Sequence, residues 1–128
     1  GDALADLEAA QDNQVPFLGQ VGGYNILLLE FPHQMIPLGS MHFVVSLLKR
    51  KIRPLIAHPE RNKTIMTNPD KVAEFAQAGC WLQLTAGSLA GRFGPLAEQT
   101  AFSLIDAGWN CWGCGVLWCN GGWLYYNV

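Results

Sequence analysis

The most informative segment of this chain is Leu55-Ile56-Ala57-His58-Pro59-Glu60-Arg61-Asn62. The apolar and β-branched run at residues 52–57 is typical of a buried strand, and it ends abruptly in a charged corner. Enzymes of the α/β class present site residues in this way, at the carboxyl end of a sheet. His58 could ligate a metal and Arg61 could bind phosphate, although a hydrogen-bonded His and Arg in a Pro-containing turn would give the same pattern.

The composition of the 128 residues predicts one folded domain with a hydrophobic core. Half of the residues are hydrophobic and 14% are charged, which argues against disorder. The formal net charge of -2 gives no electrostatic basis for binding nucleic acid or an anionic membrane. No apolar run reaches the roughly 20 residues of a membrane span, and no signal peptide is visible. We therefore expect a cytoplasmic protein.

A second buried strand is predicted at residues 25–31, a continuous apolar run that contains Glu30. An ionised carboxylate in such a run is costly to bury unless it is paired or bound to a metal. Glu30 is therefore either a carboxylate at the solvent end of the strand or a metal ligand. Before this strand, residues 2–11 have the pattern of a short alanine-rich helix, and residues 16–23 predict a turn region.

Helices are predicted between the strands, where apolar residues recur with helical spacing between recognisable end signals. They cover residues 37–51, a segment that starts at Asn68 and ends at Gly79, and residues 95–107, and a third strand is predicted at residues 80–85. The order strand, helix, strand, helix, strand, helix implies right-handed βαβ units and a parallel sheet or barrel.

A glycine-rich segment at residues 85–94 follows the third strand and precedes the last helix. Such a loop lets backbone N–H groups approach an anion closely. It lacks the Lys-Ser/Thr that would complete a Walker motif. The segment is therefore either an anion-binding loop or a tight connector that needs glycine for backbone reasons.

The C-terminal tail, residues 109–128, differs from the rest of the chain. It carries no charged residue, three of the four cysteines and four of the five tryptophans. Cys111 and Cys114 form a C-x-x-C pattern, but no helix follows to lower a thiolate pKa. With Cys119, a zinc site would still lack an obvious fourth ligand. We favour a strand with an unusual end, or a tail translated out of its proper frame, over a metal or redox site.

Three segments together strongly resemble the bacterial capsule-type protein tyrosine phosphatases of the polymerase-and-histidinol-phosphatase superfamily. They are Leu29-Glu30-Phe31-Pro32, Ala57-His58-Pro59-Glu60-Arg61-Asn62, and Gln83-Leu84-Thr85-Ala86-Gly87-Ser88 with Gly91-Arg92-Phe93-Gly94. The resemblance, which covers about residues 16–109, implies an α/β fold that is a portion of a distorted (β/α)7 TIM-like barrel. It divides the chain into a partial phosphatase domain at residues 1–108 and the atypical tail.

The same resemblance implies metal-dependent hydrolysis of phosphomonoesters. The expected enzyme is a protein tyrosine phosphatase that acts on a tyrosine kinase of capsule or exopolysaccharide export. By position, Glu30 and His58 are the expected metal ligands, Arg61 the phosphate-binding guanidinium, and His33 a residue near the substrate. The expected cofactor is a cluster of divalent ions, manganese first, with iron or zinc as alternatives.

The chain departs from the family at both ends of its pattern. The opening His-x-His pair and the closing Asp-x-His pair, which supply most of the metal ligands, are absent. We therefore expect an incomplete chain with little or no activity alone, and self-association through uncovered sheet edges and apolar faces. Two other interpretations remain: a non-catalytic relative that binds or regulates a kinase, and a phosphatase of the same superfamily that acts on a small phosphate ester.

Overall fold

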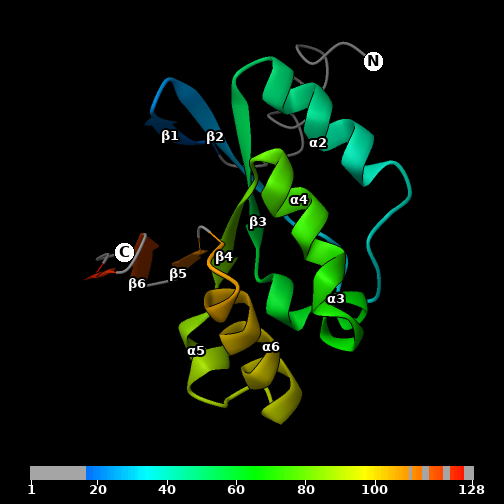
Figure 1. Cartoon of the computed structure of the whole chain (residues 1–128), viewed down its shortest axis with the longest axis vertical. Coiled ribbons are helices and arrows are strands. Elements are labelled where there is room, and N and C mark those ends of the chain that lie inside the picture. The colour runs from blue at the N-terminus through cyan, green and yellow to red at the C-terminus, as the bar shows by residue number, and fades with distance from the viewer. Residues whose placement is uncertain (1–16, 110, 114–115, 120–121, 126–128) are drawn as a thin grey trace.

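The structure is a computed structural model that describes residues 17–109, 111–113, 116–119 and 122–125, and these form a sheet with helices packed against it (Figure 1). The described elements, in chain order, are β1 (Phe17–Val21), β2 (Tyr24–Leu29), α2 (Ser40–Lys49), β3 (Ile52–Ala57), the 3-10 helix η1 (Pro59–Arg61), α3 (Lys63–Thr67), the 3-10 helix η2 (Pro69–Val72), α4 (Ala73–Ala78), β4 (Trp81–Leu84), α5 (Ala86–Leu89), α6 (Pro95–Asp106), β5 (Cys111–Gly113), β6 (Val116–Cys119) and β7 (Gly122–Tyr125).

The centre of the sheet is parallel, as the sequence predicts. The strands lie side by side in chain order, and β2, β3, β4 and β5 run in one direction. Leu28 pairs with Leu55, and Ile56 pairs with Leu82. Parallel neighbours need crossover connections, which helices supply between β2 and β3, between β3 and β4, and between β4 and β5. The predicted α/β class is therefore confirmed.

The first hairpin corrects the predicted turn region at residues 16–23. Phe17–Val21 is strand β1, antiparallel to β2, and only Gly22 and Gly23 form the turn. Their φ angles are 59° and 82°, which suits a two-residue hairpin turn and which glycine adopts without steric cost. The prediction was wrong because the glycines mark the turn but do not reveal that the chain before it pairs with β2.

The strands after α6 also extend beyond the prediction. β5 pairs in parallel with β4, so the expected strand is present, but β6 and β7 add two antiparallel strands, with Leu117 opposite Leu124. The tail has no alternation of apolar and polar residues that would have predicted them, and their ladder is made by backbone groups that every residue except proline carries. Cys114 and the expected helix at residues 2–11 lie outside the described residues.

The helix boundaries follow the predicted end signals. The side chain of Asn68 accepts a hydrogen bond from Asp70 N at the start of η2 and α4, and Gly79 ends α4 with φ 119°. Helix α2 begins at Ser40, three residues later than predicted, and keeps Lys49 in its last turn. Across the described segments, none of the helices combines the length and apolarity that a membrane span requires.

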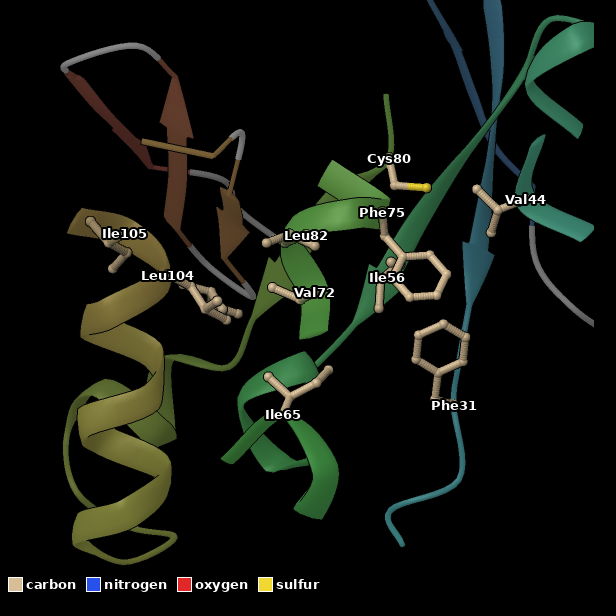
Figure 2. Packing of buried hydrophobic residues seen from close by; sticks show 11 residues of the cluster. Phe31, Val44, Ile56, Ile65, Val72, Phe75, Cys80, Leu82, Leu104 and Ile105 are labelled. Atoms are coloured by element: carbon tan, nitrogen blue, oxygen red, sulfur yellow. The ribbon is translucent and has the colours of Figure 1, made fainter. Parts of the chain in front are cut away.

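The main core lies between the parallel strands and the helices (Figure 2). Its buried residues are Phe31, Val44, Ile56, Ile65, Val72, Phe75, Cys80, Leu82, Leu84, Leu104 and Ile105. The rings of Phe31 and Phe75 lie 5.4 Å apart and are tilted by 59°. Because Phe31 directly follows Glu30 in the chain, its burial anchors the point at which Glu30 leaves the sheet.

Candidate metal and phosphate site

The candidate site lies where β2 and β3 end. Leu29 and Ile56 are paired in register, so Glu30 and His58 emerge at the same edge of the sheet. Glu30 Oε1 lies 3.1 Å from His58 Nε2. The structure thus brings together the two side chains that were predicted to be metal ligands, while their role as ligands stays a prediction.

His58 has an unusual backbone that shapes this corner. Its φ of 34° and ψ of 55° lie in the left-handed region, which costs a residue other than glycine about 1–3 kcal/mol. The conformation ends β3 abruptly and starts η1, in which Arg61 N donates to His58 O at 3.0 Å. The turn therefore directs His58 and Arg61 out of the sheet at the same corner.

His33 lies against His58. The two ring centroids are 5.2 Å apart and the planes differ by 20°, so the rings are stacked. His33 is exposed and comes three residues after Glu30. The structure brings the predicted His33 to the site, and its contact with substrate stays a prediction.

Asn62 holds this part of the site in place. It is 3% exposed, and its amide nitrogen donates to Pro32 O at 2.8 Å and to Met35 O at 3.0 Å. Its amide oxygen accepts from Ile65 N at 3.2 Å, as the N-cap of α3. The sequence analysis gave Asn62 no such role, although an Asn directly before a helix is a recognisable cap signal.

The Glu30–His58 pair fits two adjacent positions of a metal shell. Metal–ligand distances of about 2.0–2.2 Å at a right angle place two donor atoms roughly 3 Å apart, close to the 3.1 Å between Oε1 and Nε2. The Glu30 side chain is 64% exposed and that of His58 is 21% exposed, so both can be reached from solvent. Within the described ranges, however, no three His, Cys, Asp or Glu side chains are grouped closely enough to hold an ion. The pair alone is thus too small for a complete metal site, and its role as part of one stays a prediction.

Glu60 is a buried carboxylate whose role the sequence analysis missed. It is 0% exposed, and its Oε1 accepts hydrogen bonds from Thr85 N at 2.9 Å and from Ser88 Oγ at 2.8 Å. Its Oε2 is also buried and has no hydrogen-bond partner in the part of the chain that the structure describes. Glu60 thus fastens the glycine-rich segment to the corner after β3. The local sequence carries no signal that separates it from an exposed carboxylate.

The glycine-rich segment at residues 85–94 folds into the short helix α5 and a loop. Ser88 N donates to Thr85 O at 2.9 Å, and Arg92 N donates to Gly87 O at 2.8 Å. Gly91 and Gly94 have φ of 80° and 93°, which glycine alone adopts readily. Gly91 and Gly94 therefore serve the backbone geometry of a connector, while the anion-binding alternative stays a prediction.

Arg61 lies on the ring of Phe93, which projects from this connector. The guanidinium carbon is 4.0 Å from the ring centroid, within the range of a cation–π contact. Among the residues that the structure describes, no carboxylate or carbonyl accepts a hydrogen bond from this guanidinium. Stacking covers a face of the group and leaves its in-plane N–H donors able to bind an anion. The predicted phosphate-binding role of Arg61 is consistent with this geometry and stays a prediction.

Comparison with known proteins gives three consistent matches. The family model described as "Capsular polysaccharide synthesis, CpsB/CapC" matches residues 9–109. The putative tyrosine-protein phosphatase CapC of Staphylococcus aureus is 40% identical over 81 residues, which is 63% of this chain and 32% of that protein. The tyrosine-protein phosphatase YwqE of Bacillus subtilis (strain 168) is 33% identical over 100 residues, which is 78% of this chain and 39% of that protein.

A solved structure has the same fold. It is described as belonging to YwqE from Bacillus subtilis and CpsB from Streptococcus pneumoniae, "unique metal-dependent tyrosine phosphatases". The match has a TM-score of 0.67 and 32% identity, and it covers 84% of this chain and 41% of that one. The fold is therefore an α/β fold with a curled mixed sheet that resembles half a barrel, and the chain spans less than half the length of the relatives it matches.

Proposed function

The chain belongs to the CpsB/CapC family of capsular polysaccharide synthesis, and from this premise we propose that it is part of a metal-dependent protein tyrosine phosphatase. The proposed reaction is hydrolysis of the phosphomonoester of phosphotyrosine. The observation that carries the proposal is the 3.1 Å approach of Glu30 Oε1 to His58 Nε2, in the corner that also holds Arg61. Metal donors and an anion-binding group are two of the components that such chemistry needs.

In this proposal Glu30 and His58 hold a divalent ion through Oε1 and Nε2. When bound, the ion supplies Lewis-acid activation of the phosphate ester and of water. The carboxylate and the imidazole suit manganese, with iron or zinc as alternatives, because both nitrogen and oxygen donors are present. The left-handed backbone of His58 and the burial of Phe31 keep the two donors in place.

Arg61 is proposed to bind the phosphate. Its guanidinium can donate two parallel hydrogen bonds to phosphate oxygens and offset the charge on them during phosphoryl transfer. The Phe93 ring orients the guanidinium by stacking on it. His33, exposed beside His58, is proposed to contact the substrate and can hold or release a proton at a ring nitrogen.

The pair of donors does not complete a metal cluster. Structural and catalytic metal sites in proteins use three or more ligands, and the described residues offer no such group. The chain also spans only 32% and 39% of its two curated relatives. We therefore propose that residues 1–108 are a part of a (β/α)7 barrel, that other segments supply the remaining ligands, and that residues 109–128 are atypical.

The proposed substrate is phosphotyrosine on a bacterial tyrosine kinase of capsule or exopolysaccharide export. The tyrosine-phosphatase names of the relatives and the capsule description of the family support this assignment. Because protein phosphotyrosine is formed from ATP, we also propose that the protein acts in the cytoplasm.

The test is hydrolysis of a phosphotyrosine peptide with Mn²⁺ and with a chelator. We expect little or no turnover by the 128-residue chain, and Mn²⁺-dependent turnover by a longer protein in which this chain is joined to the missing ligand segments. His58→Gln in the longer protein should abolish turnover. His42→Gln is the matched control, because His42 is exposed on α2 and is not part of the corner. Turnover that survives the chelator, or that His58→Gln leaves unchanged, would contradict the proposal.

A further inference from the structure

A small cavity lies next to Arg61. It has a volume of about 170 Å³ and is lined by Arg61, Met66, Phe93 and Ala97. These residues come from η1, α3, the connector before α6, and α6 itself. A cavity of about 150 Å³ in a protein can hold a benzene ring. The cavity is therefore of the size of one aromatic ring, and it is open to solvent, with three apolar side chains and one guanidinium in its lining.

The position of Phe93 is built into the connector. A Cβ atom placed on Gly87 would lie 2.9 Å from Phe93 Cε2, so the ring packs on a site where only glycine leaves room. Phe93 is nevertheless 44% exposed, so it is a wall of the cavity and not a core residue. The absence of a side chain at Gly87 and the stack on Arg61 together favour this position of the ring in the cavity wall.

We propose that this cavity receives the phenyl ring of phosphotyrosine and that Phe93 makes the site prefer aryl to alkyl phosphates. The proposal rests on the function proposed above and specifies its substrate selectivity. The phosphate would meet the in-plane N–H groups of Arg61, and the phenyl ring would pack against the edge of Phe93 and the thioether of Met66. A phosphoserine side chain has no ring to fill the cavity and gains only the contact with Arg61.

The first test measures binding of two phosphonates that cannot be hydrolysed, phenylphosphonate and methylphosphonate, to the 128-residue chain by NMR titration. We expect the chain to bind phenylphosphonate more tightly. Phe93→Leu should weaken phenylphosphonate about three- to tenfold more than it weakens methylphosphonate, which is the contribution of one aromatic pair beyond the anion contact that both ligands share. Phe102→Leu is the matched control, because Phe102 is similarly exposed on α6, at 45%, but does not line this cavity.

Gly87→Ala provides a second variant that keeps Phe93 and moves its ring. Gly87→Ala should also reduce the ratio of the affinities for phenylphosphonate and methylphosphonate. If Phe93→Leu fails to fold, this variant tests the proposal in its place. The proposal is overturned if the unmodified chain binds the two phosphonates with equal affinity or does not bind phenylphosphonate. It is also overturned if the variants lose affinity for both phosphonates by the same factor.

A second measurement separates this inference from the proposed function. In the longer, Mn²⁺-activated protein, Phe93→Leu should lower the ratio of turnover between phosphotyrosine and phosphoserine peptides of the same sequence. An unchanged ratio with intact metal-dependent turnover would contradict only the aryl subsite. An aryl preference in binding without any metal-dependent turnover would contradict only the phosphatase.

Discussion

Two arginines at opposite ends of β3 both stack on aromatic rings, but they are used differently. Arg53, at the amino end, has its guanidinium 4.3 Å from the ring centroid of Tyr24 and 4.7 Å from that of Trp81. Its Nη1 donates to Gly79 O at 2.6 Å. Arg53 therefore links β2, β3, β4 and the end of α4 to one another.

Arg61, beyond the carboxyl end of β3, contacts a single ring, that of Phe93. In the described segments it donates to no carboxylate or carbonyl, so its hydrogen-bonding edge is left for a ligand. The comparison teaches that stacking alone does not distinguish a structural arginine from a functional one. The distinction lies in whether the in-plane donors are used within the protein.

The largest expected effect comes from Arg61→Lys. In the Mn²⁺-activated protein it should lower kcat/KM for a phosphotyrosine peptide by about 100- to 1,000-fold, because lysine cannot donate two parallel hydrogen bonds to the phosphate. Its melting temperature should stay close to that of the unmodified protein. Arg53→Lys is the matched control and should keep its kcat/KM. If the two variants lose activity equally, the contrast between the arginines is wrong.

Glu60→Ala should destabilise the protein by about 3 kcal/mol. The substitution leaves a part-buried donor, Thr85 N, and a buried donor, Ser88 Oγ, without their acceptor. The free energy of unfolding is measured by urea denaturation. Glu74→Ala is the control, since Glu74 is exposed on α4 and should change stability by less than about 0.5 kcal/mol. Similar losses in the two variants would show that Glu60 does not hold the connector.

Arg53→Lys should reduce the free energy of unfolding by about 1–2 kcal/mol. Lysine can keep the charge but not the planar contact with both Tyr24 and Trp81, nor the same hydrogen bond to Gly79 O. Urea denaturation of Arg53→Lys and Arg61→Lys side by side sharpens the comparison. A greater loss of stability in Arg61→Lys would reverse the assignment of the two arginines.

The smallest expected effect concerns Cys80, which lies near Arg53. Burial raises the pKa of this thiol from 9.0 to about 12, and the positive charge of Arg53 lowers it in part. The folded chain therefore keeps the proton above the pH at which the unfolded chain releases it, so the contribution to stability is complete below about pH 9 and falls as the pH rises toward 12. Between about pH 8 and pH 10, the unmodified chain should lose more unfolding free energy than Cys80→Ala. If the unfolding free energies of the unmodified chain and of Cys80→Ala fall equally over this pH range, Cys80 is not the source of the pH dependence.

Local sequence signals were sufficient for the parts of the fold that depend on them. The apolar run before His58, the proline and cap residues of the helices, and the order of elements predicted the parallel strands and the corner. Glu30 and His58 could be brought together from sequence because successive parallel strands end at one edge.

The features that were missed depend on contacts between residues far apart in the chain. Glu60 accepts a hydrogen bond from Thr85, which lies 25 positions later in the chain, and no local sequence signal near Glu60 predicts that partner. The role of Phe93 could not be predicted from the local sequence either, because it depends on contacts with Gly87 and Arg61. The pairing of β1 with β2 and of β6 with β7 is likewise set by backbone hydrogen bonds and not by the side-chain pattern.

The central claim is that Glu30 and His58 bind one divalent ion together, and Mn²⁺ titration of the three histidines tests it most directly. Mn²⁺ broadens NMR signals of nearby protons, so the ring signals of His58 and of the stacked His33 should broaden at lower Mn²⁺ than that of His42. Glu30→Gln should remove this selective broadening. Broadening that affects the three rings alike, or that persists in Glu30→Gln, would contradict the claim.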